Sequence, residues 1–298
     1  KLQKSEQEML QLLSSLALSL SMVVFAEADN MSKFDEHLAR EKLLALSAGA
    51  YSSHPEKCLQ RKLPGAAIMR EVSVNCDRFK DKCYGFVALS PEDQAIIITF
   101  RGTNKLEQLL AETEESAFEK HTPFEAGGQV SEYWNDAFMD VWKGGLNQTF
   151  SLISSVYPSY KLWITGHSLG GVMASMAAAT VSAQGQFPPE QIVLVTFGQP
   201  RTGNRAFADS FDKLVPQTFR VTHKKDIVPH LPFEILAYYH HSQEIFYPND
   251  MTGKNIVYKT CGRQEDKACS DGQLDLSVGD HLRYYGKDIP LYGIAGCI

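Results

Sequence analysis

The sequence predicts an α/β fold in which helices cover both faces of a mostly parallel central sheet. Short apolar runs alternate with helical patterns along the chain, and several runs are almost continuously apolar, as strands buried on both faces should be. Polar or turn residues bound each run, which favours strands. The predicted strands are Tyr84–Leu89, Ala95–Phe100, Lys161–Thr165, Gln191–Phe197 and Thr218–Thr222.

Four further segments carry apolar residues at helical spacing. They are Phe34–Ala50, Tyr133–Val156 with an interruption at Gly144-Gly145, the alanine-rich Leu169–Ala183, and Asn204–Leu214. No linker-like change of composition and no internal repeat divides the chain. We therefore expect a single domain over residues 29–298, preceded by a leader at residues 1–28.

The leader is predicted from an uncharged apolar run, Leu10–Ala26, that ends at the small-x-small pattern Ala26-Glu27-Ala28. These features are typical of a secretory signal peptide near residues 9–28, and they indicate a secreted protein. A membrane anchor and an amphipathic helix are the alternatives, although the run is short for an anchor and rich in serine. Two glycosylation sequons, at Asn30 and Asn147, agree with secretion.

The cysteine pattern also fits an oxidising compartment. The chain has six cysteines, and none lies in a CxxC pair or in a histidine-rich zinc spacing. An even number suits three disulfides, of which the spacing leaves the pairing open, whereas six buried thiols in a cytosolic enzyme are the alternative. No metal site is expected. A formal net charge of −6 gives no basic surface for nucleic acid.

The segment Gly166-His167-Ser168-Leu169-Gly170 joins a predicted strand to a predicted helix. This GxSxG pattern is typical of a nucleophilic serine at a sharp turn, where small neighbours leave room for strained backbone. The helix N-terminus would direct its positive dipole end at a developing oxyanion, with the backbone N–H of Leu169 as one donor. A plain strand-to-helix turn is the alternative.

A nucleophilic serine needs a histidine base, and the base needs an acid that fixes its tautomer. Asp226 follows a predicted strand, and His281 lies near the C-terminus, so both follow Ser168 in the expected order. From the pattern alone, other downstream histidines stay open as the base: His230, His240 and His241.

A second oxyanion donor is expected in the loop after the strand Ala95–Phe100, at Gly102-Thr103. Gly102 would let the backbone approach the substrate, and Thr103 offers its backbone N–H and its hydroxyl. An ordinary turn after a strand is the alternative.

Four segments together resemble the class 3 lipases, the fungal Rhizomucor-type family with animal members. They are residues 98–103 (ITFRGT), 164–171 (ITGHSLGG), 195–204 (VTFGQPRTGN) and 223–230 (HKKDIVPH). Residues 239–247 and 279–281 resemble C-terminal blocks of the same family, so that the resemblance covers about residues 35–298. Val130-Ser-Glu-Tyr-Trp134 departs from the fungal Val-His-x-Gly-Phe pattern and resembles the animal members.

This resemblance implies an α/β-hydrolase fold with a Ser168, Asp226 and His281 triad and an oxyanion hole from Thr103 and Leu169. It also implies three disulfides, Cys58–Cys297, Cys76–Cys83 and Cys261–Cys269, and a lid helix over the site. The implied activity is hydrolysis of carboxylic esters of acylglycerols, without a cofactor.

The lid would lie in residues 105–118 (KLEQLLAETEESAF), where Leu106, Leu109 and Leu110 share one helical face and glutamates fill the other. An ordinary surface helix is the alternative. The acidic face favours neutral glycerides over acidic phospholipids. We therefore expect a secreted lipase acting at an oil–water or membrane interface, with no obligate protein partner. A phospholipase A1, a soluble-ester or feruloyl-type esterase and a catalytically silent lipid-binding protein are the alternatives.

Overall fold

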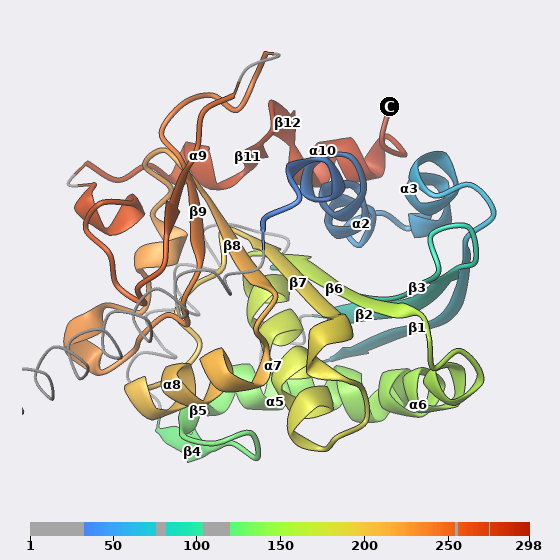
Figure 1. Ribbon diagram of the computed structural model, residues 1–298. Coiled ribbons are helices and arrows are strands. Elements are labelled where there is room, and N and C mark those ends of the chain that lie inside the picture. Colours follow the sequence, from blue (N-terminus) through green and yellow to red (C-terminus); the bar gives the residue numbers. More distant parts are fainter. Residues whose placement is uncertain (1–32, 76–81, 104–119, 254–255, 274) are drawn as a thin grey trace, which may run out of the picture. The chain divides into compact units, whose positions relative to one another are not determined.

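The central element is a mixed sheet with parallel strands in its middle. The computed structural model describes residues 33–75, 82–103, 120–253, 256–273 and 275–298. In these residues the main sheet has eight strands in the order β1-β2-β3-β6-β7-β8-β9-β10 (Figure 1). The neighbours from β3 to β9 pair in parallel, and β1, β2 and β10 add antiparallel edges. The strands are β1 (Ala67–Asn75), β2 (Lys82–Ser90), β3 (Ala95–Phe100), β6 (Lys161–His167), β7 (Ile192–Phe197), β8 (Thr218–His223), β9 (Glu244–Tyr247) and β10 (Lys259–Cys261).

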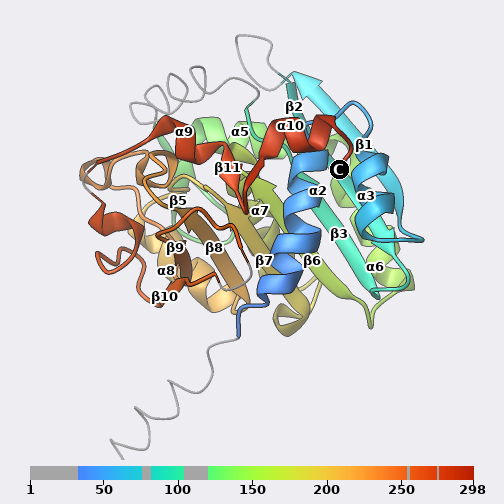
Figure 2. The same ribbon diagram turned by 90° about the horizontal axis from the view of Figure 1, so that it is seen from above.

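Helices cover both faces of this sheet, which confirms the predicted α/β layering (Figures 1 and 2). One face carries α2 (Leu44–Gly49), α3 (Pro55–Lys62) and α10 (Ile289–Ile294). The other face carries α5 (Glu132–Val141), α6 (Asn147–Val156), α7 (Leu169–Ala183) and α8 (Arg205–Leu214). The short helix α9 (Val278–His281) precedes the hairpin of β11 (Arg283–Tyr284) and β12 (Lys287–Asp288), and β4 (His121–Pro123) pairs with β5 (Gln129–Ser131).

The five predicted strands correspond to β2, β3, β6, β7 and β8. The predicted long helix is interrupted, as expected, because Gly145 has a φ of 129° that no helix contains. β1 was not predicted, because it lies at the sheet edge and most of its residues are exposed or half-buried. The short strands β9 and β10 were not predicted either, since they are only 4 and 3 residues long.

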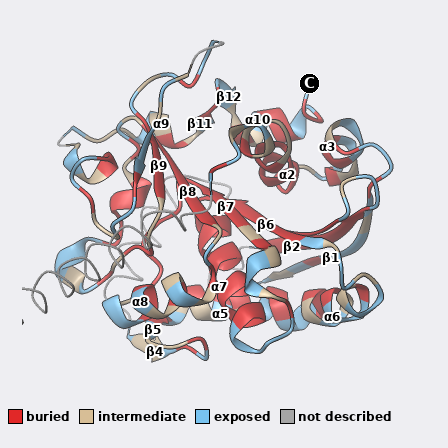
Figure 3. Cartoon of the chain, viewed as in Figure 1, coloured by how far each residue is buried: buried red, intermediate tan, exposed pale blue. Residues whose placement is uncertain are grey.

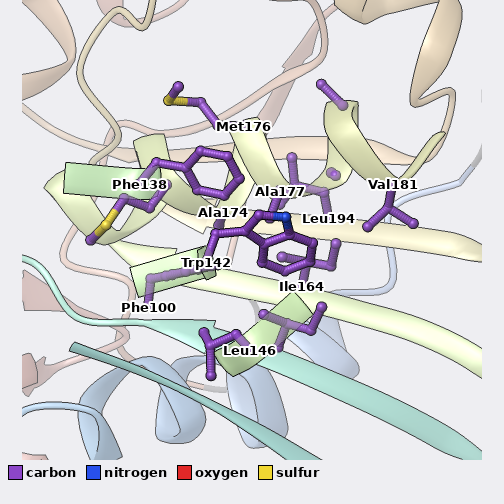
Figure 4. Packing of buried hydrophobic residues seen from close by; sticks show 14 of the residues in the cluster. Phe100, Phe138, Trp142, Leu146, Ile164, Ala174, Met176, Ala177, Val181 and Leu194 are labelled. Atoms are coloured by element: carbon purple, nitrogen blue, oxygen red, sulfur yellow. The ribbon is translucent and has the colours of Figure 1, made fainter. Parts of the chain in front are cut away.

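Much of the core lies where α7 packs against the sheet. Residues 169–182 of this helix are all buried, and the strands beneath them are buried as well (Figure 3). In Figure 4, the aromatic side chains of Phe138 and Trp142 lie close to Ala174 and Ala177 of α7. Small alanine side chains let neighbouring side chains and strands pack closely against α7.

Parallel strands end at the same edge of a sheet, and here that edge collects the predicted site residues. Phe100 of β3 pairs with Gly166 of β6, and His167 pairs with Phe197 of β7. Phe197 in turn pairs with Val221 of β8. The segments that follow these four strands therefore lie next to one another.

Two disulfides tie distant or exposed segments to this framework. Cys58 of α3 is bonded to Cys297 after α10, over a sequence separation of 239 residues. Cys261 of β10 is bonded to Cys269, over a separation of 8 residues. Cys83 is also disulfide-bonded, whereas Cys76 lies outside the described residues. In the described part of the chain, no helix is both long and apolar enough to cross a membrane.

Candidate active site

The turn between β6 and α7 holds Ser168 in a strained conformation. Its φ of 62° and ψ of −132° lie in a region that residues with a side chain rarely adopt. The flanking glycines make the turn possible. A β-carbon at Gly166 would lie 2.2 Å from the carbonyl oxygen of Gly170, and one at Gly170 would lie 2.4 Å from that of Phe100. The spacing of the GxSxG segment thus follows from close backbone contacts.

The loop after β3 lies directly against this turn. A β-carbon at Gly102 would lie 2.9 Å from the β-carbon of Ser168 and 2.5 Å from the carbonyl oxygen of His167. Thr103 follows in the same loop. Leu169 is the first residue of α7, where backbone N–H groups lack partners within the helix. The two predicted oxyanion donors therefore flank Ser168 from two different elements.

Asp226 and His281 form a buried pair beside this turn. The Nδ1 atom of His281 lies 3.0 Å from each carboxylate oxygen of Asp226. The Tyr284 hydroxyl donates to Asp226 Oδ2 at 2.6 Å, and the Val228 N–H donates to Oδ1 at 2.9 Å. Burial by itself would raise the pKa of Asp226. The charge and hydrogen bond of His281, with the donors from Tyr284 and Val228, instead hold that pKa below its ordinary value.

An ionised Asp226 fixes the tautomer of His281. Because the carboxylate accepts a hydrogen bond from the Nδ1–H group, the proton stays on Nδ1 and Nε2 is left as the basic nitrogen. Among the described residues, neither His281 Nε2 nor Ser168 Oγ has a hydrogen-bond partner, and both residues are 1% exposed. The backbone N–H of Ser168 donates to the carbonyl oxygen of Phe197 at 2.9 Å. An uncommitted base and an uncommitted hydroxyl are thus held at the same sheet edge.

Gly198, the residue after β7, provides the space for the acid–base pair. Its φ is 56°, and a β-carbon there would lie 2.8 Å from Asp226 Oδ2 and 2.9 Å from His281 Nδ1. Neither this role nor that of Tyr284 was predicted. Gly198 lies within the quoted segment 195–204, and Tyr284 lies three residues after His281, but neither position carries a sequence signal of its contact.

The other candidate bases, His230, His240 and His241, lie in the interior. The Nε2 atom of His240 is 2.7 Å from the carbonyl oxygen of Pro229. The ring of His241 stacks on Phe211 with centroids 4.0 Å apart. Burial lowers the pKa of His230, and it holds the pKa values of His240 and His241 well below the ordinary histidine value. These three side chains are therefore neutral groups of the interior, and His281 is the histidine placed against Asp226.

Arg201 fixes the loop that follows Asp226. Its side chain donates to the carbonyl oxygens of His230 and Pro232 at 2.6 and 3.2 Å, and to both carboxylate oxygens of Glu265 at 3.1 and 2.8 Å. The Glu265 carboxylate lies in the segment closed by the Cys261–Cys269 disulfide. This buried arginine thus joins the disulfide-closed segment to the loop beside the acid.

Some predicted residues lie outside the described part of the chain. They are the lid residues Leu106, Leu109 and Leu110, together with Cys76 and the sequon at Asn30. The predicted signal peptide, residues 1–28, also lies outside the described residues. These assignments stay predictions.

The sheet order and the strand-to-helix turn at Ser168 define an α/β-hydrolase. Residues 97–236 match the model of the family described as lipase (class 3). A lipase of Caenorhabditis elegans is 34% identical in an alignment 299 positions long, which covers 89% of this chain and 83% of the relative. The chain therefore belongs to the class 3 lipase family.

Fungal members of the family are similar in sequence and in structure. The secreted mono- and diacylglycerol lipase 1 of Fusarium solani is 29% identical over 67% of this chain, which spans 59% of that relative's length. The crystal structure of a lipase from Rhizopus microsporus var. chinensis superposes with a TM-score of 0.74 at 25% identity, over 87% of this chain and 93% of that one.

Proposed function

We propose that this protein is a secreted serine lipase that hydrolyses carboxylic ester bonds of acylglycerols through an acyl-enzyme on Ser168. The observation that carries the proposal is the buried Asp226–His281 pair beside a strained serine whose hydroxyl is uncommitted among the described residues. Membership of a lipase family, and relatives named as lipases, support the substrate class.

In the acylation step, the Ser168 oxygen attacks the ester carbonyl carbon while its proton passes to His281 Nε2. The Asp226 carboxylate stabilises the resulting imidazolium without taking the proton. Negative charge develops on the former carbonyl oxygen, next to the N–H of Leu169 and the loop at Thr103. The tetrahedral intermediate collapses when the alcohol leaves with the proton from His281.

In the deacylation step, His281 Nε2 takes a proton from water, and the hydroxide attacks the acyl carbon. The proton then returns to the Ser168 oxygen, which leaves as the acid product is released. In the resting enzyme the serine and base need not be hydrogen-bonded, since such contacts often tighten only when substrate binds.

The test measures hydrolysis of triolein emulsion, tributyrin, soluble p-nitrophenyl butyrate and phosphatidylcholine vesicles by the parent, Ser168→Ala and Ser175→Ala. Ser175 is a matched control because it is a buried serine of α7 that donates to the Val172 carbonyl oxygen at 2.8 Å. We expect turnover of emulsified glycerides that Ser168→Ala abolishes and Ser175→Ala retains.

Other outcomes of this assay would reject parts of the proposal. Turnover limited to the soluble ester would indicate an esterase, and preference for phosphatidylcholine would indicate a phospholipase A1. Lipid binding without Ser168-dependent turnover would leave a binding protein.

Secretion is part of the same proposal, and the two disulfides in the described residues support it. Expression of the full chain in a eukaryotic secretory host should release protein whose N-terminal sequence begins near residue 29. Retention of residues 1–28 on the cellular protein would contradict the signal-peptide prediction.

A further inference from the structure

A buried hydrogen-bond chain links the candidate oxyanion loop to the candidate base. The hydroxyl of Tyr51, which follows α2, lies 2.8 Å from His167 Nδ1. The backbone N–H of Gly102 donates to the same hydroxyl oxygen, and a β-carbon at Gly102 would approach that oxygen to 2.4 Å. Tyr51 therefore contacts both the loop after β3 and the residue before Ser168.

The direction of each hydrogen bond follows from the groups at the ends of the chain. The Nε2 atom of His167 lies 2.9 Å from the carbonyl oxygen of His281. A carbonyl oxygen only accepts, so Nε2 carries the proton and Nδ1 accepts from the Tyr51 hydroxyl. Burial lowers the pKa of His167 to about 3 and raises that of Tyr51, so both groups are neutral near pH 7.

His167 also contacts the base through its ring. The imidazoles of His167 and His281 are stacked with centroids 4.5 Å apart and planes inclined by 27°. The same side chain thus holds the backbone of His281 through a hydrogen bond and supports its ring through stacking. Because Ser168 is the next residue, His167 ties the nucleophile and the base to one rigid unit.

We propose that Tyr51 is a positioning residue that sets the oxyanion loop, the nucleophile turn and His281 relative to one another through His167. This inference rests on the proposed ester hydrolysis, because positioning is measured through catalysis.

Buried polar groups in any protein interior form hydrogen bonds, so the same contacts could serve stability alone. The experiment therefore distinguishes a positioning role of Tyr51 from a purely structural one. Tyr51→Phe removes only the hydroxyl. Tyr247→Phe is the matched control, because Tyr247 is buried and its hydroxyl is hydrogen-bonded to Tyr285 at 3.1 Å, outside this chain of contacts. Both variants lose one tyrosine hydroxyl from the interior.

For Tyr51→Phe we expect kcat on a soluble ester to fall about tenfold with KM unchanged, since the nucleophile turn and His281 would be held less well in the geometry that the transition state requires. Phosphonylation of Ser168 by a p-nitrophenyl phosphonate should slow in parallel. Tyr247→Phe should retain the parent kcat and phosphonylation rate. Thermal melting of both variants reports any general loss of stability.

A double-mutant cycle tests whether Tyr51 acts through His167. If it does, Tyr51→Phe should have a smaller effect in a His167→Asn background than in the parent, because only the contact of Tyr51 with the loop at Gly102 is left to lose there. Parent-like kcat in Tyr51→Phe, or effects of the two substitutions that simply multiply, would overturn the inference. A parent protein that neither turns over esters nor labels at Ser168 would instead reject the proposed function.

Discussion

Gly198 lies so close to His281 that a β-carbon at position 198 would stand 2.9 Å from the Nδ1 atom of the imidazole. The same β-carbon would stand 2.8 Å from a carboxylate oxygen of Asp226. The candidate acid and base therefore depend on a residue without a side chain, which itself takes no part in proton transfer.

Gly198→Ala should move the base and lower kcat/KM on a soluble ester on the order of a hundredfold, because small displacements at a reacting centre are costly. Gly185→Ala is the matched control. Gly185 has a similar positive φ of 62°, but a β-carbon there would meet nothing within 4 Å. We expect Gly185→Ala to share the backbone strain and to keep its activity. Equal activity of both variants would contradict the role of Gly198.

Tyr284→Phe should weaken the acid without removing it. The lost hydroxyl donates to Asp226 Oδ2 at 2.6 Å and helps to lower the pKa of that carboxyl. Without this hydroxyl the pKa of Asp226 rises, so the loss of activity on acidification should begin at a higher pH than in the parent. At the optimum pH, activity should fall by roughly tenfold. A pH–rate profile checks this. A profile identical to that of the parent would show that Tyr284 is dispensable.

Acid should destabilise the fold through its buried histidines. Burial lowers the pKa of His167 to about 3, and those of His240 and His241 lie well below the ordinary value of 6.5. A lowered histidine pKa means that the unfolded chain binds the proton first. The stabilisation is therefore complete above pH 6.5 and is lost as the pH falls toward the folded-state values.

Denaturant unfolding from pH 7.5 to pH 5 would measure this loss. His241→Gln should reduce the slope of unfolding free energy against pH by about 1.4 kcal/mol per pH unit, the value for one proton. An unchanged slope in this variant would show that His241 is not the group that titrates on unfolding.

The Cys58–Cys297 and Cys261–Cys269 disulfides should differ in how much they stabilise the fold. Chain-entropy arguments give about 5.5 kcal/mol for the 239-residue separation of Cys58 and Cys297, and about 2.5 kcal/mol for the 8-residue separation of Cys261 and Cys269. Replacing each pair by alanine and measuring unfolding free energies compares them. A larger loss from the Cys261–Cys269 pair would indicate that the Glu265–Arg201 contact, rather than loop closure, dominates.

Local patterns in the sequence predict part of the candidate site. Ser168 was predictable because the strand, the two glycines and the alanine-rich helix are contiguous, and Asp226 because it follows a strand. His281 needed the chain order and the family resemblance, since His230, His240 and His241 fit the local criteria as well. Their burial against backbone carbonyls and aromatic rings became visible only in the structure.

The residues that support the site were not predictable in this way. Tyr51 contacts His167, from which it is separated by 116 residues of sequence. Gly198 lies against His281, which belongs to a different element. Such contacts depend on the strand order and on the way α2 and α9 pack, and the spacing of residues along the sequence predicts neither. The sequence around a single tyrosine or glycine does not predict which distant residue it will contact.

The bond between Cys58 and Cys297 also orders events during biosynthesis. Translation proceeds from the N-terminus, so Cys58 emerges from the ribosome 239 residues before its partner exists. The Cys261–Cys269 bond needs only 8 further residues. Until Cys297 leaves the ribosomal exit tunnel, the thiol of Cys58 either stays reduced or forms a disulfide with the wrong cysteine. Correct maturation of this protein therefore requires oxidation after synthesis of nearly the whole domain, and a disulfide isomerase would correct earlier mispairing.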